Sequence, residues 1–264
     1  MRTFLLLLLC LVLWKPLPAQ SEFKNQVSLY LGLQQHLVAD RQASPLHYQG
    51  ILPAIGLDFS HKQKRGLFQI EATVAGGAFD ASAYSGRTVD YGEVEVHLEG
   101  KILRGGIAFR YLRRVQKSHS LRTYLGLGLQ QRIDYPGAEP YVGLIALSSI
   151  PLVARIEKNG PRNQLLYAQL GYALGGVFTR LPWWHTSIAL PGESSQFNAF
   201  YRNNTQWVWG TQLAALDFRM GYQHQLGLRW RVGAQYDMSF LQHSKPQQLQ
   251  IFNQHLKLQF TRLF

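Results

Sequence analysis

The chain of 264 residues has a formal net charge of +12, yet only 16% of its residues are charged, against roughly a quarter in soluble domains. Hydrophobic residues make up 46% of the chain, but no apolar run reaches the roughly 18 residues of a membrane-spanning helix, which excludes helical spanning. Lys and Arg are spread over turns and strand ends without a basic helix or an aromatic RNA-binding motif, so we expect no nucleic-acid partner.

Residues 1–19 have the features of an export signal, because a positively charged start is followed by the continuously apolar residues 4–14. We expect cleavage after Ala19, which leaves residues 20–264 as a single domain. The only cysteine, Cys10, would leave with the signal. The mature chain would then have no disulfide and no thiol chemistry.

The rest of the chain alternates apolar and polar residues in short segments, and this period of two is typical of strands with one oily and one polar face. In order, the pattern predicts ten strands, at residues 26–34, 55–60, 68–74, 91–112, 122–130, 141–156, 166–174, 207–222, 225–240 and 255–264. Short connections at 61–66, 113–120, 157–163 and 224–225 alternate with connections at 39–49, 81–90, 134–140, 180–204 and 242–248.

Two of these segments are ambiguous. In 91–112 the apolar positions change parity around Arg104-Gly105-Gly106, and we interpret this change as a β-bulge within one long strand. The alternative is a hairpin at Glu99-Gly100-Lys101, which would add strands. Residues 141–156 are apolar on both faces and give no clear orientation, so eight or twelve strands remain alternatives to ten.

The last segment, 255–264, resembles a known sequence signal. Leu256, Leu258 and Phe260 alternate with polar residues and the sequence ends on Phe264, which resembles the C-terminal insertion signal of Gram-negative outer-membrane β-barrels. Arg262 departs from this pattern at one outward position.

The resemblance implies an all-β fold, a transmembrane antiparallel up-and-down β-barrel of about ten strands. It also implies a place in the cell outer membrane with both termini in the periplasm. The expected partners are outer-membrane lipid, lipopolysaccharide and, during insertion, the barrel-assembly machinery.

Charged residues at the inward positions of such a barrel would lie in its lumen. The pattern places nine there: Glu71, Glu93, Glu95, Arg122, Arg132, Arg229, Arg231, Asp237 and Lys257. Buried charges must be paired or hydrated, so an internal ion-pair network that plugs the barrel is the favoured interpretation, with a narrow polar conduit as the alternative.

Five tryptophans are candidates for the membrane interface, where aromatic rings with one polar edge gather. They are Trp183, Trp184, Trp207, Trp209 and Trp230.

The same aromatic region contains the one enzyme-like fragment. His185, Ser187 and Glu193 could serve as base, nucleophile and orienting group of an acyl-transfer triad. The His-x-Ser element is similar to that of outer-membrane lipid A deacylases, which implies acyl-ester hydrolysis. Pro182 and Pro191 bracket the fragment, however, and this is more typical of a loop than of the strand that carries the element in that family.

The histidines have no metal-ligand spacing, and the glycine pairs lack the context of a phosphate loop, so we expect no metal and no cofactor. We therefore expect a non-enzymatic outer-membrane barrel, either a structural or binding barrel or a narrow pore, with an aromatic extracellular loop at 180–204. The alternatives are a lipid A or phospholipid acyl-ester hydrolase and a soluble periplasmic lipid-binding barrel.

Overall fold

The computed structural model describes residues 24–42, 46–81, 88–90, 95–97, 100–118, 121–138, 144–181, 205–210, 212–245 and 247–264. The long strands of this part are β1 (Asn25–Asp40), β2 (His47–Lys62), β3 (Gly66–Ala78), β7 (Lys101–Lys117), β8 (Leu121–Ala138), β9 (Leu144–Gly160), β10 (Gln164–Leu181), β12 (Leu213–Leu226), β13 (Trp230–His243) and β14 (Leu249–Leu263). The shorter elements are β4 (Asp80–Ala81), β5 (Thr88–Asp90), β6 (Glu95–His97), β11 (Thr205–Trp209) and the 3-10 turn η1 (Pro161–Asn163). No helix in these ranges is long and apolar enough to cross a membrane.

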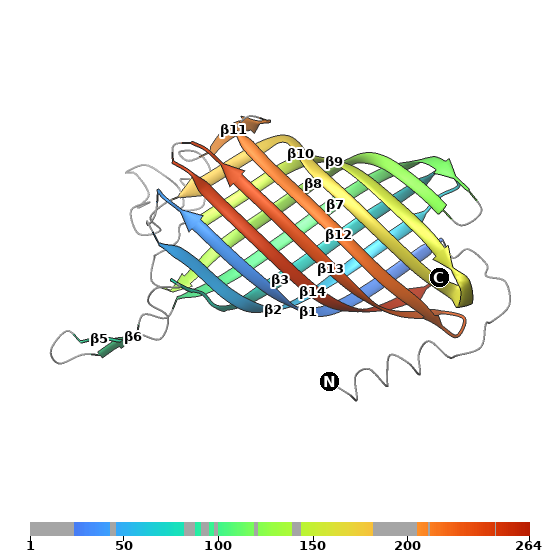
Figure 1. The fold of residues 1–264 in the computed structure, drawn as a ribbon, viewed down its shortest axis with the longest axis horizontal. Helices are drawn as coiled ribbons and strands as arrows, with labels where there is room; N and C mark the ends of the chain where they lie inside the picture. The colour runs from blue at the N-terminus through green and yellow to red at the C-terminus, as the bar shows by residue number, and fades with distance from the viewer. Residues whose placement is uncertain are drawn as a thin grey trace, which may run out of the picture.

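The long strands form one antiparallel barrel, because each pairs with the next long strand and β1 pairs with both β2 and β14 (Figure 1). The closing ladder runs from Gln26 opposite Leu263 to Asp40 opposite Leu249 without a register shift. Closure leaves no open sheet edge, which is the condition for strands to exist in lipid. The predicted barrel of about ten strands is confirmed with ten, and eight or twelve strands are excluded.

The two ends of the barrel differ in the length of their connections. At one end, called here the short-turn end, the connections are 63–65, 118–120, 161–163 and 227–229. At the opposite, long-connection end they include 79–100 and 182–212. Asn25 and Phe264 lie together at the short-turn end, where the N–H of Phe264 donates to the carbonyl oxygen of Asn25 at 3.0 Å.

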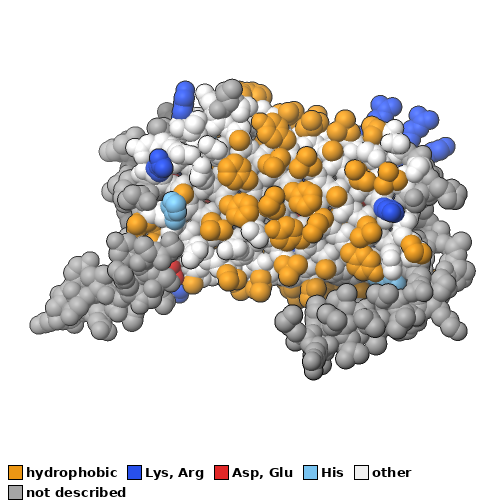
Figure 2. Space-filling view, viewed as in Figure 1, with side chains coloured by type: hydrophobic (Ala, Val, Ile, Leu, Met, Phe, Trp, Pro, Cys, Tyr) orange, Lys and Arg blue, Asp and Glu red, His pale blue; other side chains and the backbone are white. Residues whose placement is uncertain are grey.

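The outer wall carries a belt of apolar side chains (Figure 2). Across the closing seam, six of them face each other in pairs and are 40–61% exposed: Leu29 with Phe260, Leu31 with Leu258 and Leu33 with Leu256. Phe264 is also exposed, and Arg262 lies with its guanidinium carbon 5.0 Å from the Phe264 ring centre. Alternation along each strand therefore separates an apolar outer face from a polar inner one, as in transmembrane barrels.

The prediction of one long strand over 91–112 is wrong. β6 pairs with β5 in a separate two-stranded sheet, and the barrel strand β7 begins only at Lys101. The register between β3 and β7 is continuous past Gly105 and Gly106, so no bulge lies against β3 there. The parity change in the sequence arises because a hairpin outside the barrel precedes β7, and part of the predicted connection 81–90 belongs to that hairpin.

The predicted tight connection at 224–225 is also wrong. The turn lies at 227–229, where Gly227 has a φ of 65°, a left-handed conformation that glycine adopts without strain. The predicted strand at 207–222 is divided between β11 and β12, which explains the change of parity near Leu213.

The described part of segment 141–156 shows why its residues are apolar on both faces of the strand. β9 begins at Leu144 and turns Ile145 and Leu147 toward the barrel interior, which is itself apolar at this height. The preceding strand β8 continues to Ala138 through the predicted break at 134–140.

Two tyrosines cover glycines on neighbouring strands and fill the lumen beside them. Tyr30 lies directly opposite Gly56, and Tyr167 directly opposite Gly221. A Cβ atom at Gly56 would lie 2.2 Å from Cζ of Tyr30, and a Cβ atom at Gly221 would lie 2.3 Å from Cζ of Tyr167. Only glycine leaves room for these rings.

We predict that Gly56→Ala lowers the free energy of unfolding by about 1–3 kcal/mol, because the added methyl group displaces the Tyr30 ring. Gly105→Ala is the matched control, since a Cβ atom there has no neighbour within 4 Å. Urea unfolding of both variants in lipid vesicles, followed by tryptophan fluorescence, measures the difference. Equal stability of the two variants would contradict the prediction.

Candidate functional site

The lumen is the candidate site, and its long-connection half is filled by apolar side chains. These buried residues, called here the apolar layer, are Val38, Tyr48, Leu52, Ala54, Ala75, Phe79, Ile102, Ile145, Leu147, Ala173, Phe178, Val208, Leu213, Ala215, Leu241, Leu249 and Ile251. They come from strands all around the barrel, and Leu52, Phe178 and Leu213 have no exposed surface. This part of the lumen is packed like the core of a soluble protein.

A buried ion pair lies at the long-connection end of the apolar layer. Arg180, at the end of β10, donates to both carboxylate oxygens of Asp40, at the end of β1. It also donates from Nη1 to the carbonyl oxygen of Gln247 at 2.7 Å. The two side chains are 2% and 0% exposed, so this pair connects opposite walls where the barrel opens.

The middle of the lumen holds five charged residues, called here the central ion cluster: Glu71, Arg110, Arg219, Asp237 and Lys257. Glu71 on β3 accepts from Arg110 at 3.0 Å, from Arg219 at 2.7 Å and from Lys257 at 3.2 Å. Asp237 on β13 accepts from Arg219 at 3.1 Å and from Lys257 at 2.6 Å. Because these residues lie on five strands, their bonds cross the whole lumen. The cations surround both carboxylates, as buried charges require.

A second polar group lies between the central ion cluster and the apolar layer. Arg104 donates to Asp134 at 2.5 Å and to the side chain of Asn253 at 2.6 Å. Arg132 donates to Asp217, and Nδ1 of the buried His36 contacts Oδ1 of Asn253.

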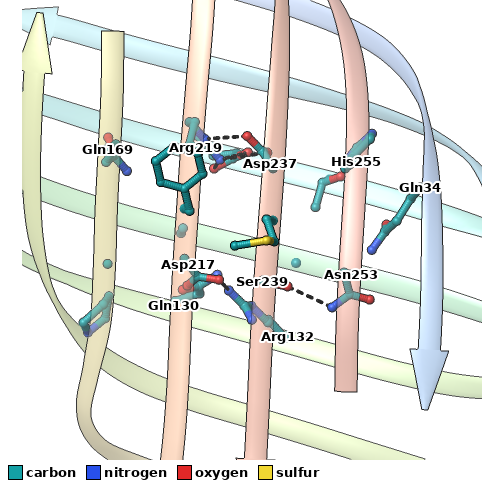
Figure 3. Close-up of a pocket in the computed structure, with 18 of the residues that line it drawn as sticks. Gln34, Gln130, Arg132, Gln169, Asp217, Arg219, Asp237, Ser239, Asn253 and His255 are labelled. Carbon is teal, nitrogen blue, oxygen red and sulfur yellow. Dashed lines mark hydrogen bonds and ion pairs between the residues drawn. The ribbon is translucent and has the colours of Figure 1, made fainter. Parts of the chain in front are cut away.

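A cavity of about 130 Å³ separates these two groups, with room for several water molecules. In Figure 3, Arg219 and Asp237 lie on one side of it, and Arg132, Asp217 and Asn253 on the other. The walls of the cavity carry charged side chains of both ion groups beside apolar ones such as Phe218 and Met238.

The short-turn end of the lumen is also occupied. Glu157 on β9 accepts from Lys62 at 3.0 Å and from Arg155 at 2.9 Å. A small apolar cluster of Leu67, Leu112, Tyr124 and Val153 is buried at the same end.

The predicted lumen charges are only partly placed there. Glu71, Arg132, Asp237 and Lys257 lie in the lumen and form ion pairs. Arg122 and Arg231 occupy lumen-facing positions near the short-turn end.

Two of the nine predicted lumen charges lie outside the lumen, and a third is not among the described residues. Arg229 is exposed in the turn that Gly227 begins, so its assignment to the lumen is wrong. Glu95 lies on β6, which does not pair with the barrel, so its assignment to the barrel wall is also wrong. Glu93 lies outside the described residues.

The sequence pattern misses most of the other ion-paired residues of the lumen. They include Asp40, Lys62, Arg104, Arg110, Asp134, Arg155, Glu157, Arg180, Asp217 and Arg219. Several stand at inward positions of strands whose limits were misplaced, and Glu157 had been assigned to a turn. Correct strand ends, with strict inward parity, would have identified Glu157 and Arg219.

The exposed tryptophans lie near the two ends of the barrel wall. Trp207 and Trp209 on β11 stack with ring centres 6.4 Å apart, and both are more than half exposed. Trp230 is exposed near the short-turn end. Trp183 and Trp184 lie outside the described residues, and the interface role of all five stays a prediction.

The enzyme-like residues His185, Ser187 and Glu193 also lie outside the described residues, so the triad stays a hypothesis. In the described part of the chain, no group of three or more His, Cys, Asp or Glu side chains could hold a metal ion.

We predict that Glu71→Gln lowers the free energy of unfolding by about 3–5 kcal/mol, because it leaves three buried cations short of a carboxylate. The matched control is Asp217→Asn, where the carboxylate is 31% exposed and pairs with Arg132 alone among the described ion pairs. Denaturant titration in one detergent compares the two. A loss for Glu71→Gln no larger than for the control would contradict a central role of Glu71.

Comparisons with known proteins support the fold but identify no specific family or activity. No protein-family model and no curated protein sequence matches the chain. Among solved structures, the outer-membrane protease OmpT from Escherichia coli matches with a TM-score of 0.51 and 8% sequence identity, over 95% of this chain and 99% of OmpT. The translocator domain of the autotransporter NalP from Neisseria meningitidis matches with a TM-score of 0.41 and 12% identity, over 92% of this chain and 90% of that one. The chain has the fold of the Gram-negative outer-membrane β-barrels.

Proposed function

We propose that this protein is an integral outer-membrane barrel that does not conduct solutes and instead anchors its long connections at the cell surface, where they bind a partner. The observation that carries the proposal is the filled lumen. The central ion cluster, the apolar layer and the pair of Arg180 with Asp40 follow one another along the barrel axis toward the long-connection end.

The filled lumen favours an anchor over the alternative of a narrow pore. A pore needs a continuous aqueous path, whereas the cavity of about 130 Å³ lies between two groups of ion-paired side chains, and the apolar layer lies beyond the second group. A solute would have to separate buried ion pairs and enter an apolar core, and both steps are costly.

The distribution of polarity favours a membrane barrel over a soluble lipid-binding barrel. A soluble carrier would present a polar exterior and an apolar cavity. Here the exposed belt is apolar, and the cavity is lined by charged and amide side chains such as Arg132, Asp217 and Asn253.

The proposal includes an orientation and partners. The short turns and Phe264 face the periplasm, and the long connections, with the aromatic segment 180–204, face outward. This follows the usual arrangement of such barrels, which have short periplasmic turns and long extracellular loops. Lipopolysaccharide and phospholipid then contact the apolar belt, and the barrel-assembly machinery inserts the chain.

We predict that the purified barrel shows no stable open state in planar lipid bilayers, because packed side chains cross its lumen. A known outer-membrane porin, reconstituted in the same lipid, is the positive control. Reproducible single-channel steps from the wild-type chain would overturn the anchor proposal and favour the alternative of a narrow pore.

We predict opposite labelling of cysteines at the two ends in intact cells. With a membrane-impermeant maleimide, Arg41→Cys at the long-connection end is labelled and Lys64→Cys in a short turn is not, although both positions are exposed. After permeabilisation both are labelled, which controls for reactivity. The reverse pattern in intact cells would show that the proposed orientation is wrong.

A further inference from the structure

Among the described residues, the short-turn end of the lumen gathers more positive charge than its carboxylates, Glu157 and Asp58, can balance. Lys62, Arg122, Arg155 and Arg231 project from four different strands around Glu157. We call these five residues the short-turn cation cluster. The four cations and Glu157 sum to a formal charge of +3, and the neighbouring Asp58 carboxylate, which lines the same space as Lys62 and Arg155, reduces the excess to +2.

Two of the cations, Lys62 and Arg155, are bonded to the carboxylate of Glu157. Oε2 of Glu157 accepts from Lys62 at 3.0 Å, and Oε1 accepts from Arg155 at 2.9 Å. Arg155 is further fixed by a hydrogen bond to Gln169 at 3.2 Å and by its position 4.2 Å above the Tyr167 ring. Both carboxylate oxygens of Glu157 therefore already accept hydrogen bonds from Lys62 and Arg155.

Arg231 lacks an acceptor of its own. Its Nε and Nη1 atoms are shielded from solvent and have no hydrogen-bond partner among the described residues. Glu157 is close enough to attract it electrostatically but does not form an ion pair with it, and the neighbouring Arg122 repels it. Shielding a guanidinium without an acceptor costs free energy, and a bound group that accepts its hydrogen bonds recovers that cost.

We propose that Arg231 and the short-turn cation cluster bind an oxyanion, specifically the phosphate group of a small solute that enters from the short-turn end. A guanidinium offers a planar pair of N–H donors that matches two oxygens of a phosphate group. The side chain of Arg231 is only half-buried, so the guanidinium can turn toward the mouth of the barrel without unfolding the wall. The strands of the cluster hold the other cations around the same space.

The site differs from the lumen sites described above in charge balance. In the central ion cluster, each carboxylate is bonded to at least two cations. At the short-turn end Glu157 is likewise bonded to two cations, but Arg231 beside it has no hydrogen-bond acceptor among the described residues. A polar plug needs balanced charge, whereas a receptor for an anion needs an excess of donors.

The test is a titration of the purified full barrel with inorganic phosphate, in a lipid-free, non-ionic detergent and at constant ionic strength set with chloride. Isothermal calorimetry should give saturable binding for the wild type. Arg231→Gln should weaken this binding at least about tenfold, the effect of losing hydrogen bonds to a charged group. Arg229→Gln is the matched control, because this exposed arginine stands two residues away and should leave binding unchanged.

The outcomes are distinct. No binding of phosphate by the folded wild type, or equal binding by Arg231→Gln, would overturn the proposal and leave the cluster merely hydrated. Equal losses for both arginine variants would also overturn it, since they would indicate non-specific attraction by net charge. If added phospholipid displaces the bound phosphate, the anion belongs to a lipid headgroup and the solute is the wrong source. Heat-modifiable gel mobility confirms that each variant is folded.

Discussion

The pairing of β1 with β14 is the constraint on which the rest of the structure depends. In lipid, an unpaired N–H or carbonyl group has no water to bind, so a sheet can cross a membrane only when it has no edge. The ladder from Gln26 to Asp40 satisfies this condition along the full length of both strands. Closure then gives every residue of a strand one of two environments, the lipid or the lumen.

The lumen environment explains the pattern of buried polarity. A closed ring of ten strands is narrow enough for inward side chains from opposite walls to meet, as Glu71 on β3 and Arg219 on β12 do. Charges at such positions are costly when isolated, and Glu71, Asp237 and Glu157 are each bonded to two or more cations. Toward the long-connection end the same inward positions carry leucine, valine and phenylalanine, and the charged lumen gives way to an ordinary hydrophobic core.

Much of the fold could be predicted because apolar and polar residues alternate along most of the strands. Strands such as 26–34 and 255–264 have an apolar face, and both correspond to barrel strands, β1 and β14, that extend further than predicted. The errors arose where alternation was interrupted by something that local sequence does not encode. The hairpin of β5 and β6 was merged into a barrel strand, and a turn that depends on the conformation of Gly227 was placed too early.

The candidate site was less predictable than the fold. The sequence indicates which residues face inward, but it does not indicate which strands lie opposite each other across the barrel. Glu71 and Lys257 were both assigned to the lumen, yet their contact, 186 positions apart in the chain, depends on closure. Apolar inward residues such as Ile145 were missed as a layer because inward positions were expected to be polar.

The pairs of Tyr30 with Gly56 and of Tyr167 with Gly221 have a consequence for how such a sequence can diverge. Each ring occupies the volume in which the partner's side chain would stand. Neither member can therefore drift independently: a larger residue at the glycine position would be tolerated only after the tyrosine had become smaller. In an alignment of descendants of this chain, these positions would change together or remain fixed, so that two columns would reveal neighbouring strands without any structure.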